Sequence, residues 1–130
     1  MKSKSELTPL QVEICLNRGT ERPFTGKLLG QTHQGIYRCV VCHEALFQSE
    51  TKFESGCGWP SFFEAISKSA VRYLEDHSHG MHRVEIRCGH CDSHLGHVFN
   101  DGPTPTGLRY CVNSVSMCFE DQETGEMIEG

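Results

Sequence analysis

The sequence predicts a mainly β protein that forms a single domain over residues 1–130. Its apolar runs are short, rich in β-branched and aromatic side chains, and separated by clusters of Gly, Ser, Asp and His. These runs do not alternate with long helical patterns, so a parallel sheet built from βαβ units is not expected. A length of 130 residues suits one ordinary domain with its own core.

One short helix is predicted near the N-terminus, over about residues 8–18. Thr8 is a good capping residue, Pro9 suits the first turn, and Gln11 completes a capping box with Thr8. Gly19 is expected to end the helix. The simplest role for this helix is to cover one end of a sheet.

Strand-like runs follow the turn at residues 22–26. In order, they are Gly35–Arg38, Ala45–Phe47, Thr51–Phe53, Val71–Leu74 and Arg83–Arg87. A last strand is expected to run from Arg109 to Phe119, whereas residues 61–66 are compatible with a single helical turn. The β core therefore covers about residues 23–119, and the acidic tail 121–130 is expected to be loosely held.

Composition and charge exclude several classes of protein. A net charge of −5 argues against nucleic-acid binding, and no apolar run approaches the roughly 20 residues of a membrane span. No apolar segment follows Met1–Glu6, so no signal peptide is expected and the protein is predicted to be cytoplasmic. Thiols are normally reduced there, so the eight cysteines indicate metal binding or catalysis rather than a disulfide framework.

Two C-x-x-C pairs predict a structural zinc site. Cys39 and Cys42 form one pair, Cys88 and Cys91 form the other, and each pair follows a predicted strand. Two such pairs supply the four thiolates of a tetrahedral zinc site. The alternative is that Cys88-Gly89-His90-Cys91 is the redox motif of a thiol–disulfide oxidoreductase. That motif normally opens a helix, and little helical pattern follows Cys91.

A candidate reactive cysteine lies on the last predicted strand. If that strand is regular, Arg109, Cys111 and Asn113 lie on one face. A neighbouring cation lowers the pKa of a thiol, and the thiolate is the reactive species. The alternative is that Cys111 is a small buried apolar residue, as most free cysteines are.

Further cysteines, two histidines and a tryptophan add to this candidate site. His94, His97 and Asp101 place two proton-transferring imidazoles and a carboxylate close together. Cys57, between two glycines, lies on a flexible loop from which it can reach a second sulfur, and Trp59 follows it. Cys15 and Cys118 are expected to be packing residues, with Cys118 on the strand face opposite Cys111.

Together these motifs resemble those of the B-type methionine sulfoxide reductases. The resemblance is carried by Gly56–Phe62, His94–Phe99, Asp101–Pro103 and Arg109–Ser114, and the two C-x-x-C pairs resemble the zinc-binding form of that family. It extends from about Pro23 to Phe119. One departure is Ser114–Met117, where the family often carries a small residue and then leucine; we expect these to be packing positions.

The resemblance implies a fold of two antiparallel sheets with a few short helices and one structural Zn²⁺. It also implies an enzyme that reduces the R epimer of methionine sulfoxide in proteins, more weakly as the free amino acid, with thioredoxin as reductant. We expect the protein to be a monomer. Cys111 would be the nucleophile and Cys57 the resolving thiol. Trp59 would receive the substrate methyl group, with Phe99 beside it. The polar side of the pocket would consist of His94, His97, Asp101, Arg109 and Asn113.

The expected mechanism has three steps. The Cys111 thiolate, favoured by Arg109, attacks the sulfoxide sulfur while His97 or His94 protonates the oxygen. Methionine leaves a sulfenic acid on Cys111, which Cys57 converts into a disulfide that thioredoxin reduces. A zinc-ribbon binding module without turnover is the competing function class, and Cys118 is an extra thiol for side reactions.

Overall fold

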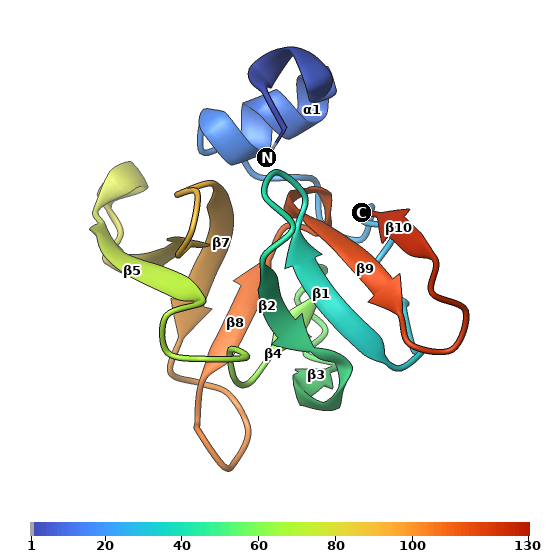
Figure 1. The fold of residues 1–130 in the computed structure, drawn as a ribbon. Coiled ribbons are helices and arrows are strands. Elements are labelled where there is room, and N and C mark those ends of the chain that lie inside the picture. The colour runs from blue at the N-terminus through green and yellow to red at the C-terminus, as the bar shows by residue number, and fades with distance from the viewer. Residues whose placement is uncertain (1) are drawn as a thin grey trace.

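The computed structural model describes residues 2–130, so Met1 of the predicted domain lies outside the described residues. Two antiparallel sheets form the protein, as predicted (Figure 1). The four-stranded sheet has the order β10 (Met127–Glu129), β9 (Met117–Asp121), β1 (Gly35–Cys39) and β2 (Ala45–Gln48). The six-stranded sheet has the order β3 (Lys52–Phe53), β4 (Ser61–Phe62), β8 (Arg109–Val112), β7 (His94–Phe99), β6 (Arg83–Cys88) and β5 (Val71–Asp76).

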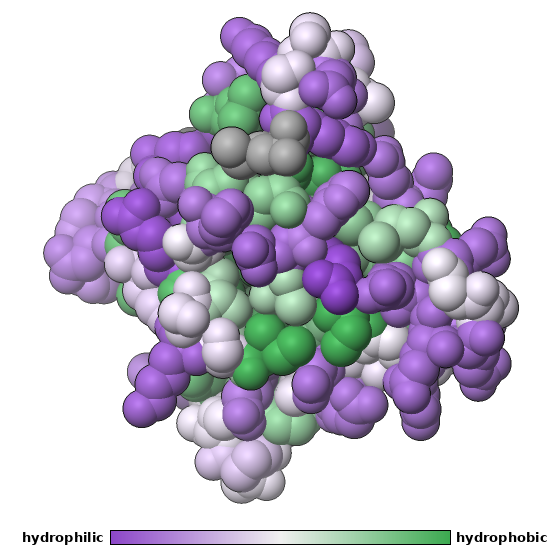
Figure 2. All heavy atoms as spheres, in the orientation of Figure 1, coloured by the Kyte–Doolittle hydropathy of each residue, from purple (hydrophilic) through white to green (hydrophobic). Residues whose placement is uncertain are grey.

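The core lies where the two sheets face each other, and aromatic side chains join them. Tyr37 of β1 and Phe47 of β2 both contact Phe62 of β4, with ring centroids 4.9 and 4.4 Å apart. All three rings are fully buried. Burial of an aromatic side chain stabilises the fold by about 1.5–3 kcal/mol, so these contacts hold the two sheets together. On the face that Figure 2 shows, hydrophilic residues predominate around small hydrophobic patches.

The N-terminal helix forms where the sequence predicts it. It comprises α1 (Pro9–Gln11) and a π-helical turn (Val12–Leu16), and Thr8 and Gln11 form the expected capping box. It lies across one end of the sheets (Figure 1) and buries Ile14 and Cys15. Arg18, not Gly19, takes the left-handed conformation that ends it, with φ of 60°. The amide of Gly19 instead donates to the carbonyl of Glu13.

The last predicted strand is two strands in different sheets. β8 ends at Val112, a 3-10 turn covers Ser114–Ser116, and β9 begins at Met117. All three residues of the turn are buried, and the alternation of apolar residues continues through it. The sequence therefore gives no sign that the strand is interrupted there. The expectation that Cys118 lies on the opposite face of the Cys111 strand is therefore wrong, since these cysteines belong to different sheets.

Two other expectations need correction, and one strand was not predicted. Residues 61–66 do not form a helical turn, because Ser61–Phe62 pairs with both β3 and β8. Residues 94–99, considered only for their histidines, form β7 in the interior of the larger sheet. The tail is not loose, since β10 pairs with β9 and the amide of Gly130 donates to the carbonyl of Met117. Within the described residues, no helix has the length and apolar character needed to span a membrane.

Candidate active site and metal centre

The two C-x-x-C pairs form matching turns at the ends of strands. In the first, the amide of His43 donates to the carbonyl of Cys39 at 2.8 Å, and in the second the amide of Asp92 donates to that of Cys88 at 2.9 Å. Both donor residues have a left-handed backbone conformation, with φ of 64° and 68°. Gly89 is required at the second turn, since a Cβ there would lie 2.0 Å from the carbonyl oxygen of Ser69. The same backbone geometry therefore presents each pair of thiols.

The fold brings the four thiols of Cys39, Cys42, Cys88 and Cys91 into one cluster. All Sγ atoms lie within 4.8 Å of one another. The closest cross pairs are Cys39–Cys91 at 3.6 Å and Cys42–Cys88 at 3.5 Å. A tetrahedron of sulfurs about 2.3 Å from a zinc ion has S–S edges of about 3.8 Å, so this cluster could hold a metal ion. Strand β7 follows Cys91 where the alternative redox motif would open a helix, which removes the structural basis of that alternative.

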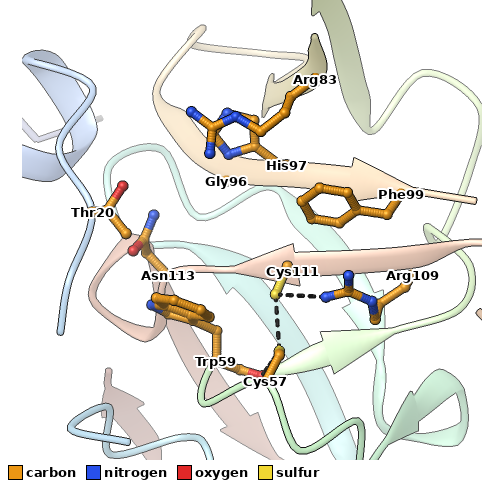
Figure 3. A pocket seen from close by; sticks show the side chains of 10 residues that line it. All are labelled: Thr20, Cys57, Trp59, Arg83, Gly96, His97, Phe99, Arg109, Cys111 and Asn113. Atoms are coloured by element: carbon orange, nitrogen blue, oxygen red, sulfur yellow. Dashed lines mark hydrogen bonds between the residues drawn. The ribbon is translucent and has the colours of Figure 1, made fainter. Parts of the chain in front are cut away.

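Cys57 and Cys111 form a second pair of thiols, far from each other in sequence. Their Sγ atoms lie 3.0 Å apart, at hydrogen-bonding distance (Figure 3). Gly56 and Gly58 flank Cys57 with φ of 76° and 95°, so the loop adopts a conformation that favours glycine on both sides of the thiol. The hydroxyl of Ser55 donates to Cys57 at 2.9 Å. The loop that the sequence marked as flexible thus delivers its thiol to the predicted reactive cysteine.

The two thiols differ in acidity. Burial raises the pKa of Cys57, but hydrogen bonds from Ser55, Ser61 and Cys111 outweigh burial and lower it to about 7. Burial, followed by the hydrogen bond to Cys57, raises the pKa of Cys111 to about 12, although Arg109 opposes the rise. The sequence-based expectation that Arg109 favours a Cys111 thiolate has the right direction, but burial prevails. The first proton that the pair loses is therefore expected to leave from Cys57, so that Cys111 keeps its own.

Strand register aligns the side chains around Cys111. Ser61, Cys111, His97 and Glu85 are direct partners in turn across β4, β8, β7 and β6. Directly paired residues of antiparallel strands point to the same face. The next pair on the same face is Phe99 and Arg109, two residues along, and the guanidinium lies 4.4 Å from the ring centroid. Ladder pairing therefore places an imidazole and an aromatic–cation pair beside the thiol.

The paired thiols open into a cavity of about 270 Å³ (Figure 3). Its lining consists of Thr20, Cys57, Trp59, Arg83, Gly96, His97, Phe99, Arg109, Cys111 and Asn113. The indole of Trp59 forms one wall, and its Nε1 donates to the carbonyl of Glu21 at 3.0 Å. Arg109, Cys111 and Asn113 share this cavity, as the alternation of the predicted strand requires. The arrangement is suited to a small apolar group with one polar atom.

Asp101 and Arg109 meet at the rim of the cavity. Arg109 Nε and Nη2 donate to the two carboxylate oxygens of Asp101, at 2.9 and 3.2 Å. Arg109 Nη1 lies 3.5 Å from Cys111 Sγ. Asp101 is itself exposed and does not line the cavity. It therefore orients the guanidinium that faces the thiol.

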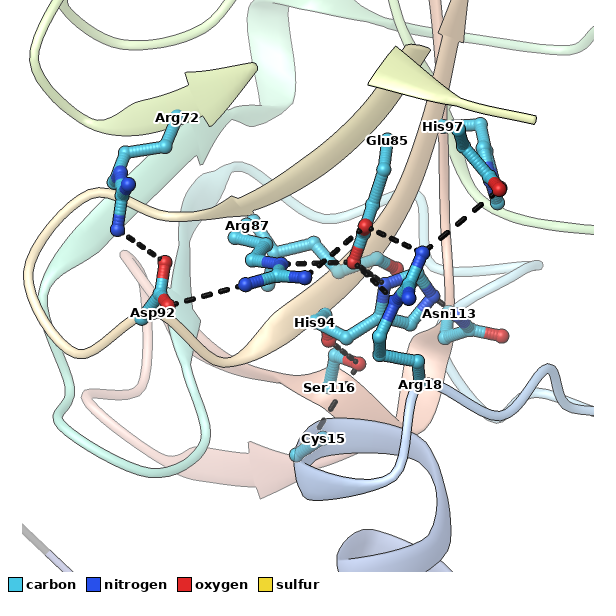
Figure 4. A network of polar contacts seen from close by, with 12 residues as sticks. Cys15, Arg18, Arg72, Glu85, Arg87, Asp92, His94, His97, Asn113 and Ser116 are labelled. Carbon is cyan, nitrogen blue, oxygen red and sulfur yellow. Dashed lines mark hydrogen bonds and ion pairs between the residues drawn. The ribbon is translucent and has the colours of Figure 1, made fainter. Parts of the chain in front are cut away.

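His94 lies behind the cavity instead of lining it. Its Nδ1 is 2.7 Å from Glu85 Oε2, and its Nε2 has no hydrogen-bond partner among residues 2–130 (Figure 4). A bulge at Leu95 turns His94 toward the same side as His97, with ring centroids 5.8 Å apart. Burial lowers the pKa of His94, although Glu85 opposes the shift. Of the two histidines, His97 alone lines this cavity, whereas His94 lines an adjoining pocket together with His97, Thr20 and Arg83.

An acidic residue that the sequence analysis missed holds His97. Asp76 Oδ2 lies 2.7 Å from His97 Nε2, and Arg83 Nη2 donates to the same oxygen at 3.3 Å. Asp76 is 5% exposed, and its hydrogen bonds with His97 and Ser78 hold the pKa of its carboxyl well below the usual range. It ends a strand whose other charged residues face solvent, so nothing in its sequence position distinguished it.

The fold and the site define a class of protein: two packed β-sheets that carry a cluster of four cysteines able to hold a metal ion and a separate thiol pair in an aromatic-walled cavity. The family model of the SelR domain matches residues 7–121, and the chain belongs to this family, that of the B-type methionine sulfoxide reductases. It is 68% identical over 130 residues, covering 100% of both chains, to "Peptide methionine sulfoxide reductase MsrB" of Pasteurella multocida (strain Pm70).

Proposed function

We propose that this protein reduces the R epimer of methionine sulfoxide, in proteins and more weakly as the free amino acid, through Cys111 and Cys57. The observation that carries the proposal is the 3.0 Å separation of the two thiols at a cavity walled by Trp59. The name of the Pasteurella relative, which states peptide methionine sulfoxide reduction, supports the reaction class. Since sulfoxide sulfur is chiral, one cavity suits one epimer.

In the first step, Cys111 attacks the sulfoxide sulfur. Its proton passes to the Cys57 thiolate over the 3.0 Å hydrogen bond, which makes Cys111 the nucleophile. His97, the cross-strand partner of Cys111, gives a proton to the sulfoxide oxygen. Oxygen is transferred to the Cys111 sulfur, methionine leaves, and Cys111 becomes a sulfenic acid. Trp59 and Phe99 enclose the substrate methyl group.

In the second step, the sulfur of Cys57 attacks the sulfenic sulfur of Cys111. A Cys57–Cys111 disulfide forms, and the sulfenic oxygen leaves as water with the proton of Cys57. The short distance between the thiols means that this step needs little movement of the loop. A low-potential dithiol then reduces the disulfide by exchange, and thioredoxin, at about −270 mV, is the reductant we propose.

The metal held by Cys39, Cys42, Cys88 and Cys91 is, in this proposal, one structural Zn²⁺. Four cysteine sulfurs in tetrahedral spacing are a donor set that zinc favours, and a site with four thiolate ligands leaves no position open for substrate. The ion would join the turn after β1 to the turn after β6, and so fasten the smaller sheet to the larger one.

The protein is proposed to work as a cytoplasmic monomer on oxidised proteins, without nucleic acid or membrane. The gathering of four of the eight cysteines into one metal-type cluster agrees with a compartment in which thiols are kept reduced. The net charge of −5 agrees with a partner other than nucleic acid.

The test is methionine release from separate R- and S-sulfoxide peptides with dithiothreitol. Wild type should convert the R peptide only, and Cys111→Ser neither peptide. Equal conversion of both epimers would contradict the assigned specificity, and a fully active Cys111→Ser would contradict the nucleophile.

A further inference from the structure

The segment from Arg18 to Leu28, hereafter the strap, lies outside the sheets yet forms part of the cavity. Thr20 lines the cavity, and the amide of Phe24 donates to the carbonyl of Gly58 at 2.7 Å, next to Cys57. Further along, the amide of Leu28 donates to the hydroxyl of Ser114 at 3.0 Å. The strap, all of which the structure describes, contains no helix or strand, so individual backbone and side-chain contacts with the rest of the chain fix its position.

Glu21 makes the strap's contacts with the two cavity residues that bear on substrate position. Its carbonyl accepts the indole N–H of Trp59, and its amide donates to Asn113 Oδ1 at 2.9 Å. The Asn113 amide nitrogen donates to the carbonyl of Leu95 at 3.0 Å, so both ends of that amide are held. The orientation of Trp59 and of Asn113 therefore depends on where Glu21 lies.

The side chain of Glu21 locates its own backbone. It is 5% exposed, its Oε1 accepts from the amide of Val115 at 2.9 Å, and its Oε2 has no hydrogen-bond partner in the part of the chain that the structure describes. Gly26 covers that oxygen, since a Cβ there would lie 2.7 Å from Oε2 and 2.4 Å from Ser114 Cβ. The carboxyl group is thus clamped between the strap and the turn at Ser114–Ser116, which links the two sheets.

Burial raises the pKa of Glu21, although the amides of Val115 and Ser114 oppose the rise. No cation is paired with its carboxyl group among the described residues. Its contacts with the rest of the chain are therefore hydrogen bonds and packing, not ion pairs.

We propose that Glu21 is a positioning residue for the reaction: its buried carboxyl docks the strap and thereby sets the indole of Trp59 and the amide of Asn113 against the substrate. The kinetic consequence rests on the proposed function, whereas the positioning of Trp59 does not. The expected phenotype is weakened substrate binding with a smaller effect on the chemical step, because neither the thiols nor His97 contacts Glu21.

The test compares Glu21→Ala, Glu21→Gln and Gly26→Ala with Glu13→Ala, which alters an exposed glutamate on the preceding helix. Because Trp59 is the only tryptophan, its emission and its quenching by acrylamide report on the strap directly. The whole 130-residue chain is used in its reduced form, and kcat and KM are measured with an R-sulfoxide peptide and dithiothreitol.

Glu21→Ala should shift the emission to longer wavelength, increase quenching, and raise KM about tenfold, the size of one lost buried hydrogen bond. Gly26→Ala should do the same by displacing the carboxyl. Glu21→Gln, which keeps the shape and the acceptor, should match wild type and the Glu13→Ala control. Unchanged emission and KM in Glu21→Ala would overturn the proposal. If Glu21→Ala does not fold, unchanged emission in Gly26→Ala would overturn it equally. Absence of turnover in wild type would refute the proposed function and leave the emission test of Glu21 intact.

Discussion

The Sγ atoms of Cys57 and Cys111 lie 3.0 Å apart, although 54 positions separate the residues along the chain. The pairing of β8 with β4 and β7 fixes the position of Cys111. A loop in which two glycines have positive φ places Cys57 next to it. The distance lets the two thiols share a proton before the reaction and form a bond after it. Most of the chemical consequences follow from this one contact.

The first prediction concerns pH. The lowered pKa of Cys57, about 7, means that the pair loses its first proton near neutrality, so the rate of methionine formation should rise through about pH 7. In Cys57→Ser, Cys111 has no thiolate to accept its proton and burial still raises its pKa. The rise should then move to or above the ordinary thiol value of about 8.5. Single-turnover rates from about pH 5.5 to about pH 10, a range that brackets both values, measure both curves. Superimposable curves would show that Cys57 takes no part in activating Cys111.

The second prediction separates the two histidines. His97 lines the cavity opposite Cys111, so His97→Ala should slow the reductase step by about 10²–10⁴-fold, as for a lost general acid. His94 is buried against Glu85 and outside the cavity, so His94→Ala should act mainly by lowering the free energy of unfolding. Denaturant unfolding and single-turnover assays on both variants distinguish these effects. If His94→Ala is as stable as wild type and loses more of the rate than His97→Ala does, the roles of the two histidines would be the reverse of those assigned here.

The third prediction concerns Asp76, which holds His97. Asp76→Asn keeps the shape but removes the charge from a buried hydrogen bond worth about 1.5–3 kcal/mol. The rate of methionine formation should therefore fall by about 10–100-fold at about pH 7, with KM nearly unchanged. Glu75→Gln is the matched control, because the side chain of Glu75 is exposed. A wild-type rate in Asp76→Asn would show that His97 does not depend on this contact.

Sequence patterns predicted the parts of the site that carry recognisable chemistry. The two C-x-x-C pairs predicted the cluster of four thiols, and alternation along one strand placed Arg109, Cys111 and Asn113 in one cavity. Sequence could not place Asp76 or Glu85, because their importance arises only when β5, β6 and β7 lie side by side. Sequence could not place the bulge at Leu95 either, and this bulge determines that the two histidines point to the same side of the sheet.

The fold was predictable in class and less so in its boundaries. Strands with strong β-branched or aromatic content, such as β1 and β6, were found nearly complete. β10 was missed because three residues with a single partly buried apolar side chain carry little pattern, and pairing with β9 is what orders them. The break between β8 and β9 was missed because burial continues through the turn that crosses between sheets.

The fourth prediction concerns the metal. The four clustered cysteines, in and after the ends of β1 and β6, should bind one zinc ion per chain. The double variant Cys88→Ser, Cys91→Ser should lose zinc binding and have a lower Tm. Cys15→Ser, which alters a buried cysteine outside the cluster, is the control for zinc content. Metal analysis paired with thermal unfolding measures both effects. Full zinc occupancy in the double variant would disprove the assignment of these ligands.

The most direct test of the account is a single-turnover count of methionine, paired with a dimedone label on Cys111. Cys111→Ser should give no methionine, because a hydroxyl is a far weaker nucleophile than a thiolate. Cys57→Ser should give close to one equivalent per chain, retain a labelled sulfenic acid on Cys111, and stall with thioredoxin. Cys118→Ser, which alters a buried thiol outside the cavity, should behave as wild type. Methionine release by Cys111→Ser, or undiminished thioredoxin-driven turnover by Cys57→Ser, would contradict the account.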